Sequence, residues 1–224
     1  MYLSRLLLNP RSRAVQRDLT DPQELHRTVM SAFPRSDRPG QAAREHFGVL
    51  HRLELDRRRA RLILYVQSLV RPDWSGLPPD YLLPVPVLDN PATKSVAEIY
   101  RSLKTGAVLS FRLKANPTRK IDTKTGPDGR RRHGRRVELV REEDQVAWLR
   151  RKGEQGGFQV LNVRVGGLSK DRSRARGRAP LTLAGVNFEG HLRITDPERF
   201  VQAVSRGIGP GKAYGLGLLS LAPP

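Results

Sequence analysis

The order in which strand-like and helix-like segments follow one another constrains the fold of this chain most. In the first half, four segments alternate as strands do and two have helical spacing. In chain order they are strand 2–8, helix 21–33, strands 49–55 and 61–68, helix 96–103 and strand 108–115. The order β-α-β-β-α-β is that of the split βαβ, or ferredoxin-like, unit. The Pro-rich stretch 72–91 is expected to be a loop.

The same order returns in the second half, after a polar and basic break. The expected elements there are strand 136–140, helix 142–152, strands 158–165 and 186–194, helix 197–206 and strand 214–221. No sequence repeat links the two halves, so the duplication rests on the order of elements alone. The sequence therefore predicts an α+β chain of two tandem ferredoxin-like (βαββαβ, RRM-like) domains. Their expected limits are 1–118 and 135–224, with a basic linker at 119–134.

Charge restricts the partners that such a chain can bind. Its 224 residues carry a formal net charge of +19 and a pI near 11.3, which is typical of proteins that hold a phosphate backbone. We expect no membrane binding, because the basic amphipathic helix with aromatic anchors that it needs is not found. Neither a signal peptide nor a membrane span is recognised, and cysteine is absent. A cytoplasmic protein is expected.

Basic residues are concentrated in two segments, 112–136 and 170–178. The first contains ten Lys or Arg against Asp122 and Asp128, and the second should form the tip of a long hairpin between two strands. One such run is typical of a solvated surface, but two with little acid to balance them favour nucleic acid. RNA fits better than DNA, because helix-turn-helix spacing is missing and zinc fingers would need cysteine.

The expected mode of RNA binding is recognition of backbone and shape by cations. Aromatic residues make up only 6% of the chain and the aromatic RNP signature is missing, so the sheets are not expected to stack bases. The expected RNA-binding residues are Lys114, Arg119, Lys120, Arg130, Arg131, Arg132, Lys170, Arg172, Arg174, Arg176, Arg178, Arg206, Gly209, Gly211 and Lys212.

Three of these residues belong to a Gly/Pro turn, 207–217, that carries one lysine and precedes an apolar strand. Glycine lets the backbone approach a ligand closely, so that N–H groups can converge on an anion such as phosphate. The turn is not a Walker loop, because Ala213 follows Lys212, and not a Rossmann turn, because a strand follows it. No nucleotide cofactor such as ATP or NAD is expected.

The five histidines indicate proton transfer at one position rather than a metal site. Their spacing contains no HExxH motif or compact ligand set, so no metal is expected. His26 lies about 100° from the apolar stripe of its helix, at the border between buried and exposed faces. An imidazole there can exchange protons near a phosphate, or simply hydrogen-bond to the backbone. His51 is interpreted as a surface or strand residue.

Several short segments in fixed order and spacing carry a family resemblance over nearly the whole chain. They are Met1-Tyr2-Leu3-Ser4, Leu25-His26, 111–117 (FRLKANP), 147–149 (AWL), Phe188-Glu189-Gly190 and 207–223. Together they resemble the CasE (Cse3) family, the CRISPR RNA-processing endoribonucleases of type I-E systems. The resemblance implies cleavage of the CRISPR repeat in the precursor RNA on the 3′ side of its stem-loop, with the product kept in the multisubunit Cascade complex. It also matches His26 to the family's catalytic histidine and the hairpin 170–178 to a basic hairpin placed against the RNA stem.

Two positions depart from the family pattern. Gln23 stands where relatives have a tyrosine, three residues before the histidine, and Ser31 stands where some have a lysine. We expect the catalytic residues to be His26, Gln23 and Arg27, aided by Lys212, in a metal-independent attack of the RNA 2′-hydroxyl that leaves a 2′,3′-cyclic phosphate. Whether His26 is the general base or the general acid stays open. The alternative is a non-catalytic scaffold that holds the RNA stem.

Overall fold

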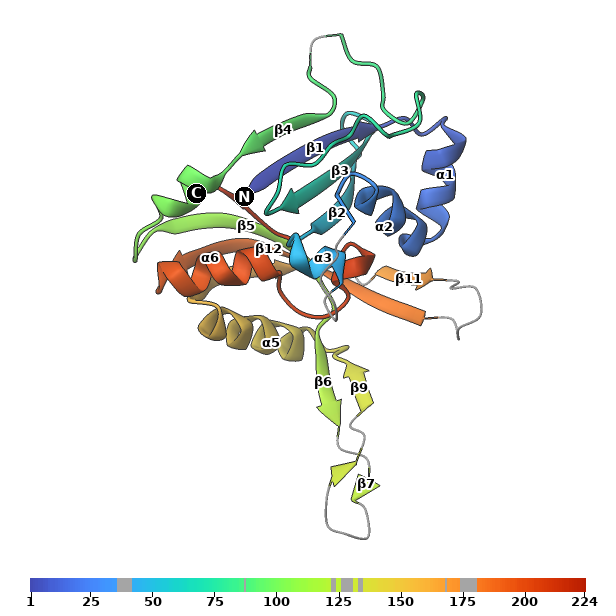
Figure 1. The fold of residues 1–224 in the computed structure, drawn as a ribbon. Helices are drawn as coiled ribbons and strands as arrows, with labels where there is room; N and C mark the ends of the chain where they lie inside the picture. The colour runs from blue at the N-terminus through green and yellow to red at the C-terminus, as the bar shows by residue number, and fades with distance from the viewer. Residues whose placement is uncertain are drawn as a thin grey trace.

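The computed structural model describes residues 1–35, 42–86, 88–121, 124–125, 131–132, 135–167, 169–173 and 181–224 (Figure 1). The first of its two larger sheets has four antiparallel strands in the order β2-β3-β1-β4. These strands are β1 (Tyr2–Leu8), β2 (Leu50–Asp56), β3 (Arg61–Ser68) and β4 (Ala92–Ser95).

The second large sheet repeats this arrangement with strands from residue 108 onward. Its order is β10-β12-β5-β13, all antiparallel, and β11 pairs with the first part of β12. The strands are β5 (Val108–Ala115), β10 (Phe158–Val165), β11 (Ser169–Ser173), β12 (Leu181–Ile194) and β13 (Leu219–Ala222). Both sheets therefore place their second, third, first and fourth strands side by side, and the predicted tandem ferredoxin-like fold is confirmed.

One strand belongs to a different sheet from the one that the sequence suggests. Residues 108–115 are expected to close the first unit, but β5 lies between β12 and β13 in the second sheet. β4 closes the first sheet instead, and α4 (Ala97–Arg101) follows it. The assignment is wrong because alternation fixes the two faces of a strand but not its partner. The limits 1–118 and 135–224 stay predictions as limits of separate folding units.

The segment 119–134, expected to be a linker, contributes to a β ribbon. β6 (Thr118–Ile121) pairs with β9 (Arg135–Glu138), and β7 (Lys124–Thr125) pairs with β8 (Arg131–Arg132). Residues of the expected strand 136–140 thus pair within the ribbon and not with the second sheet. Figure 1 shows this ribbon projecting away from the two sheets. Its many charged residues suit a strand pair that meets solvent rather than a core.

Two helices begin at Asp-Pro pairs, as the sequence predicts. They are α2 (Pro22–Met30) and α6 (Pro197–Arg206). Asp21 and Asp196 each accept a hydrogen bond from a backbone N–H two or three residues further on. Proline in the first turn removes only an N–H that the helix does not use.

The remaining helices differ in how well the sequence indicates them. α5 is expected and lies with α6 on one side of the second sheet (Figure 1), whereas α1 and α3 are not predicted. Their bounds are α1 Arg13–Thr20, α3 Ala43–His46 and α5 Glu142–Gln155, with a 3-10 turn, η1, at Lys212–Tyr214. None of the helices in the described ranges is long and apolar enough to cross a membrane.

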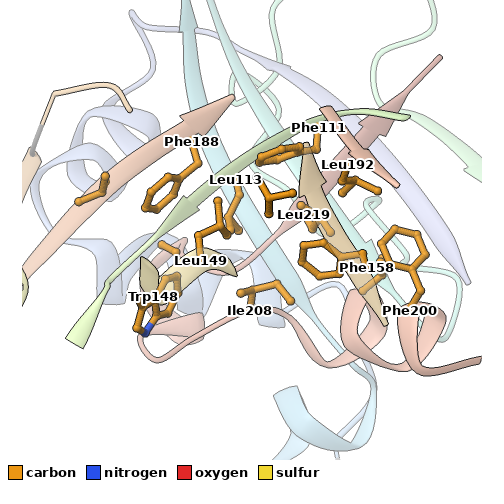
Figure 2. Packing of buried hydrophobic residues seen from close by; sticks show 14 of the residues in the cluster. Phe111, Leu113, Trp148, Leu149, Phe158, Phe188, Leu192, Phe200, Ile208 and Leu219 are labelled. Atoms are coloured by element: carbon orange, nitrogen blue, oxygen red, sulfur yellow. The ribbon is translucent and has the colours of Figure 1, made fainter. Parts of the chain in front are cut away.

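The core of the second sheet also anchors the glycine turn. Leu113 of β5 packs with Leu149 of α5 and Phe200 of α6, all fully buried. Figure 2 shows Trp148 and Ile208 along the helix side of this cluster. Because Ile208 belongs to the turn itself, the core fixes one end of that turn.

A buried arginine joins the two sheets. Arg52 of β2 is only 3% exposed and donates to the carbonyl oxygen of Leu218 at 2.9 Å and to Ser220 Oγ at 2.9 Å. Glu54 Oε1 pairs with its Nε at 2.7 Å, which compensates the buried charge. A second link runs from Gln67 Nε2 to the carbonyl oxygen of Val204 at 2.9 Å. The first sheet is thereby held against the segment that precedes and includes β13.

Candidate active site

His26 extends from α2 toward β2, where its ring faces that of His51. The ring centroids are 6.0 Å apart and the planes differ by 22°. Leu25 and Val29 turn the apolar side of α2 into the core, so the residue after Leu25 lies at the edge of that core. The predicted border position of His26 is confirmed, since its side chain is partly buried.

His51 is a buried histidine whose ring nitrogens have no hydrogen-bond partner among the described residues. The residue is 1% exposed, and both Nδ1 and Nε2 are buried without a partner. The glycine turn covers it: a Cβ added to Gly215 would lie 3.6 Å from His51 Cδ2 and Nε2. The interpretation of His51 as a surface residue is therefore wrong, although its place on a strand is right.

Burial and positive charge keep both imidazoles neutral. Burial, and after it the charge of Arg44, lowers the pKa of His26 from 6.5 to about 4. Burial, followed by the charges of His26 and Arg44, lowers the pKa of His51 to about 3. At pH 7 the ring of His26 therefore has one nitrogen with a free lone pair, and its buried Nδ1 has no partner within the described ranges. A ring in this state can accept a proton.

Arg44, on the short helix α3, is the cation that acts on this pair. Its side chain is 14% exposed and pairs with Glu45 at 2.9 Å. Arg44 also lowers the pKa of Lys212, after burial. The charge of one arginine thus acts on both histidines and on the lysine of the glycine turn.

The glycine turn packs against α2 and β2 through η1. Its geometry requires glycine at two of the predicted positions. Gly209 has φ +83°, and a Cβ there would lie 3.0 Å from the ring of Trp148. Gly211 has φ +84°, and its Cβ would lie 2.9 Å from Leu216 Cδ1. Both glycines therefore allow a close packing of the turn that any side chain would disturb.

One backbone hydrogen bond closes the turn on itself, and a second fixes it to the second sheet. The Ile208 N–H donates to the carbonyl oxygen of Gly217 at 2.9 Å, and the Gly217 N–H donates to that of Lys114 at 2.7 Å. The closing strand β13 starts only at Leu219, because residues 212–218 form η1 and an irregular segment instead of the expected strand from 214. The turn therefore has a fixed position between the two sheets.

The other predicted catalytic residues lie on the same helix with different surroundings. Gln23 is in the first turn of α2, three residues before His26, and so lies on the same side of the helix. Arg27 is 63% exposed at its side chain and is ion-paired with Glu24. No described contact joins Arg27 to His26, and both roles stay predictions.

The predicted RNA-binding residues lie in several parts of the molecule. Lys120, Arg206, Gly209 and Lys212 line one cavity. Lys114 is half-buried on β5 and Arg119 is exposed on β6, apart from that cavity. Gly211 belongs to the turn. The backbones of Lys170 and Arg172 lie on β11, next to α2, and those of Arg131 and Arg132 lie on β8. Arg130, Arg174, Arg176 and Arg178 lie outside the described residues.

Sequence reasoning missed His51 and Arg44. His51 sits in an alternating strand, where its burial next to Val49 and Leu50 gives no local signal. Arg44 lies on a four-residue helix that no periodicity marks. Among the described residues, no three His, Asp or Glu side chains gather as metal ligands.

The fold places this chain in the class of tandem ferredoxin-like proteins, with a histidine on the first unit facing a glycine turn of the second. Residues 1–223 match the family model described as CRISPR associated protein, and the chain belongs to this family. The resemblance to the CasE (Cse3) family is confirmed by two full-length relatives.

The first relative is the CRISPR-associated endoribonuclease Cse3 of Thermus thermophilus, 37% identical over 234 aligned positions, with both chains fully covered. The second is the CRISPR system Cascade subunit CasE of Escherichia coli K12, 32% identical, also with full coverage of both. A solved structure of Thermus thermophilus Cse3 bound to an RNA representing a pre-cleavage complex matches with a TM-score of 0.78 and 38% identity. The match covers 99% of this chain and 98% of that one.

Proposed function

We propose that this protein is an endoribonuclease that cleaves CRISPR precursor RNA within the repeat, on the 3′ side of its stem-loop. The relatives named Cse3 and CasE, an endoribonuclease and a Cascade subunit, support this proposal over the full length of the chain. The cleaved RNA stays bound, and the protein remains a subunit of the Cascade complex. The basic hairpin that includes β11 holds the RNA stem beside α2.

The reaction is an in-line transesterification that needs no metal. Neutral His26 accepts the proton of the RNA 2′-hydroxyl as general base. The bond between O2′ and phosphorus forms as the bond between phosphorus and O5′ breaks, which leaves a 2′,3′-cyclic phosphate. The departing O5′ takes a proton and becomes a 5′-hydroxyl. Lys212 and Arg44 stabilise the charge that builds up on the phosphate.

The observation that carries this proposal is the state of His26. A pKa lowered to about 4 leaves almost all of the imidazole unprotonated at pH 7, which suits a base and not an acid. Lys212, whose pKa burial also lowers, is a cation suited to return a proton to O5′. The low pKa of His26 and the lowered pKa of Lys212 favour the base as the role of His26.

The test uses purified protein and its cognate repeat RNA in EDTA. We expect single-turnover cleavage on the 3′ side of the stem, with a 2′,3′-cyclic phosphate detected by mass spectrometry of the 5′ fragment. An RNA that lacks the 2′-hydroxyl at the scissile nucleotide should bind and stay intact. Cleavage of that RNA, or loss of cleavage in EDTA, would contradict the mechanism.

A second candidate, a scaffold that binds the stem without cutting it, is favoured by one residue. Gln23 can form hydrogen bonds but cannot supply the ionisable hydroxyl of a tyrosine in that place. Tight binding of the cognate repeat RNA by the wild-type protein, with no cleavage over hours, would select the scaffold.

A further inference from the structure

A second site lies on the other side of the glycine turn, away from His51. There a cavity of about 690 Å³ is bounded by the turn, by the ends of α5 and α6 and by the ribbon of β6 and β9. Six cations line it, and none of its lining residues is acidic: Lys120, Arg136, Arg151, Lys152, Arg206 and Lys212. We call this the cationic cavity.

Most of these charges are not balanced by carboxylates. Within the part of the chain that the structure describes, Arg136, Arg151, Arg206 and Lys212 form no ion pair, and Lys152 donates only to Gln155 at 3.0 Å. Elsewhere on the molecule exposed arginines do find partners: Arg112 pairs with Glu54 and Glu189, and Arg164 pairs with Glu189. The cavity therefore keeps an excess of positive charge in a concave surface, which concentrates anions.

The ribbon places two cations side by side at the cavity. In the register of β6 and β9, Lys120 lies directly opposite Arg136, and both line the cavity. Like charges directly opposite on paired strands repel each other. Burial is the first cause that lowers the pKa of Lys212. The charges of Arg44, Lys152 and Arg136 lower it further, and that of Glu45 opposes them. Negative charge in the cavity would offset this repulsion.

The position of the cavity tells which part of an RNA reaches it. Lys212 lines the cavity, and η1, to which it belongs, packs on the helix that carries His26. The cavity and the helix of His26 thus meet at the same turn, so a strand whose scissile phosphate lies at His26 can continue into the cavity. The cavity lining supplies one ring, that of Trp148, which is 2% exposed, so it offers charge and little surface for base stacking.

We propose that the cationic cavity binds the backbone phosphates of the single-stranded RNA that adjoins the scissile phosphate. This inference rests on the proposed function. It adds, to the site for the stem, a subsite for the flank, which is the single-stranded RNA next to the stem-loop. The contacts are to phosphates, so the flank is held without regard to its sequence.

The test neutralises the three lining cations that the sequence does not predict as RNA ligands, in R136Q/R151Q/K152Q. Glutamine keeps most of each side chain. The matched control, R101Q/R150Q/R193Q, removes the same charge from exposed arginines that do not line the cavity. Thermal melting checks that both variants fold. The probes are a repeat RNA blocked by a 2′-deoxy scissile nucleotide, with both flanks, with either flank, and as a bare stem-loop.

The expected result is a loss specific to the flank. Removing three contacts to single-stranded RNA flattens the slope of log K against log salt by about two. Between about 50 and 200 mM salt, the cavity variant therefore loses about 16-fold less affinity than wild type. The variant binds the flanked RNA no better than the bare stem-loop, whereas wild type and control prefer the flanked RNA. In wild type, an RNA with a single flank should also bind better than the bare stem-loop when that flank is the one that enters the cavity.

Three outcomes would overturn the inference. The cavity variant could match the control on every RNA, or it could lose affinity equally for flanked RNA and bare stem-loop, which assigns the charges to the stem. It could also keep full RNA affinity but fail to join the Cascade subunits, which assigns the cavity to a protein partner. Failure of the proposed function looks different, because wild type would then neither bind nor cut the repeat RNA.

Discussion

The two faces of the glycine turn use positive charge in opposite ways. On the His26 face, two imidazoles are withdrawn from water and held neutral, and the nearest arginine is itself largely buried. On the cavity face, Arg136, Arg151 and Arg206 form no ion pair among the described residues and are exposed to solvent. Proton transfer requires a base with a free lone pair, whereas affinity for a polyanion requires charges that release counterions. The comparison predicts that changes on the first face affect rate and changes on the second affect binding.

Replacing His26 should have the largest effect. A general base contributes about 10²- to 10⁴-fold to rate, so H26A should cut the repeat RNA at least about 100 times more slowly in single-turnover assays. Because the residue lies at the edge of the core, the variant should melt and bind RNA much like wild type. The control is H191A, since His191 lies on β12 with Asn162 as its contact and faces no second histidine among the described residues. Equal rates for H26A and H191A would remove His26 from the chemistry.

The pH dependence of the same reaction separates base from acid. With a pKa of about 4, the neutral fraction of His26 rises as pH rises through 4 and is nearly complete above about pH 6. The rate measured with protein below saturation, which reports the free enzyme, should therefore rise from acid pH and be level between about pH 6 and 8. A rate that falls across this interval as pH rises would show that the protonated form is required.

Altering the glycine turn should have the next largest effect, because both faces depend on it. In G209A the added Cβ meets the ring of Trp148 at 3.0 Å with φ near +83°, so the turn must move. A displacement of about 1 Å can cost up to about 100-fold in rate, and we expect a loss of roughly tenfold in cleavage together with weaker flank binding. G106A is the matched control: Gly106 has φ +87° but open space around its Cβ position. A loss of function in G209A no greater than in G106A would show that backbone strain alone is responsible.

The elements that the sequence predicts correctly depend on local signals, and the features that it misses depend on long-range contacts. Capping by Asp21 and Asp196, and the alternation of Tyr2–Leu8, are local signals, and the structure confirms the elements that they predict. The partner of β5 is a long-range choice, because the same alternating residues could pair with either sheet. His26 is recognisable from its place on a helix together with the family resemblance. His51 and Arg44 become visible only when β2 and α3 are brought against α2.

Acid should destabilise the fold through His51. Its pKa is about 3 when folded and about 6.5 when unfolded, so the unfolded chain binds more protons between these values. The stability that neutral His51 contributes is complete above about pH 6.5 and is lost progressively as pH falls toward about 3. In H51F this loss should shrink by about 1–2 kcal/mol between about pH 6.5 and 5, measured by urea unfolding at each pH. An unchanged pH dependence in H51F would mean that His51 is not desolvated in solution.

Replacing Arg44 should have the smallest effect. This replacement separates the contribution of charge from that of burial to the low pKa of His26. Burial is the larger cause of the low pKa of His26 and the charge of Arg44 is the smaller one. In R44Q the pKa of His26 should therefore rise while remaining below the ordinary 6.5, as measured by NMR titration of the imidazole protons. R57Q is the control, because Arg57 is exposed in the turn after β2 and does not act on His26. If the pKa of His26 in R44Q reached its ordinary value, charge and not burial would keep this base neutral. The two faces of the turn would then differ in the positions of their charged residues and not in the burial of their side chains.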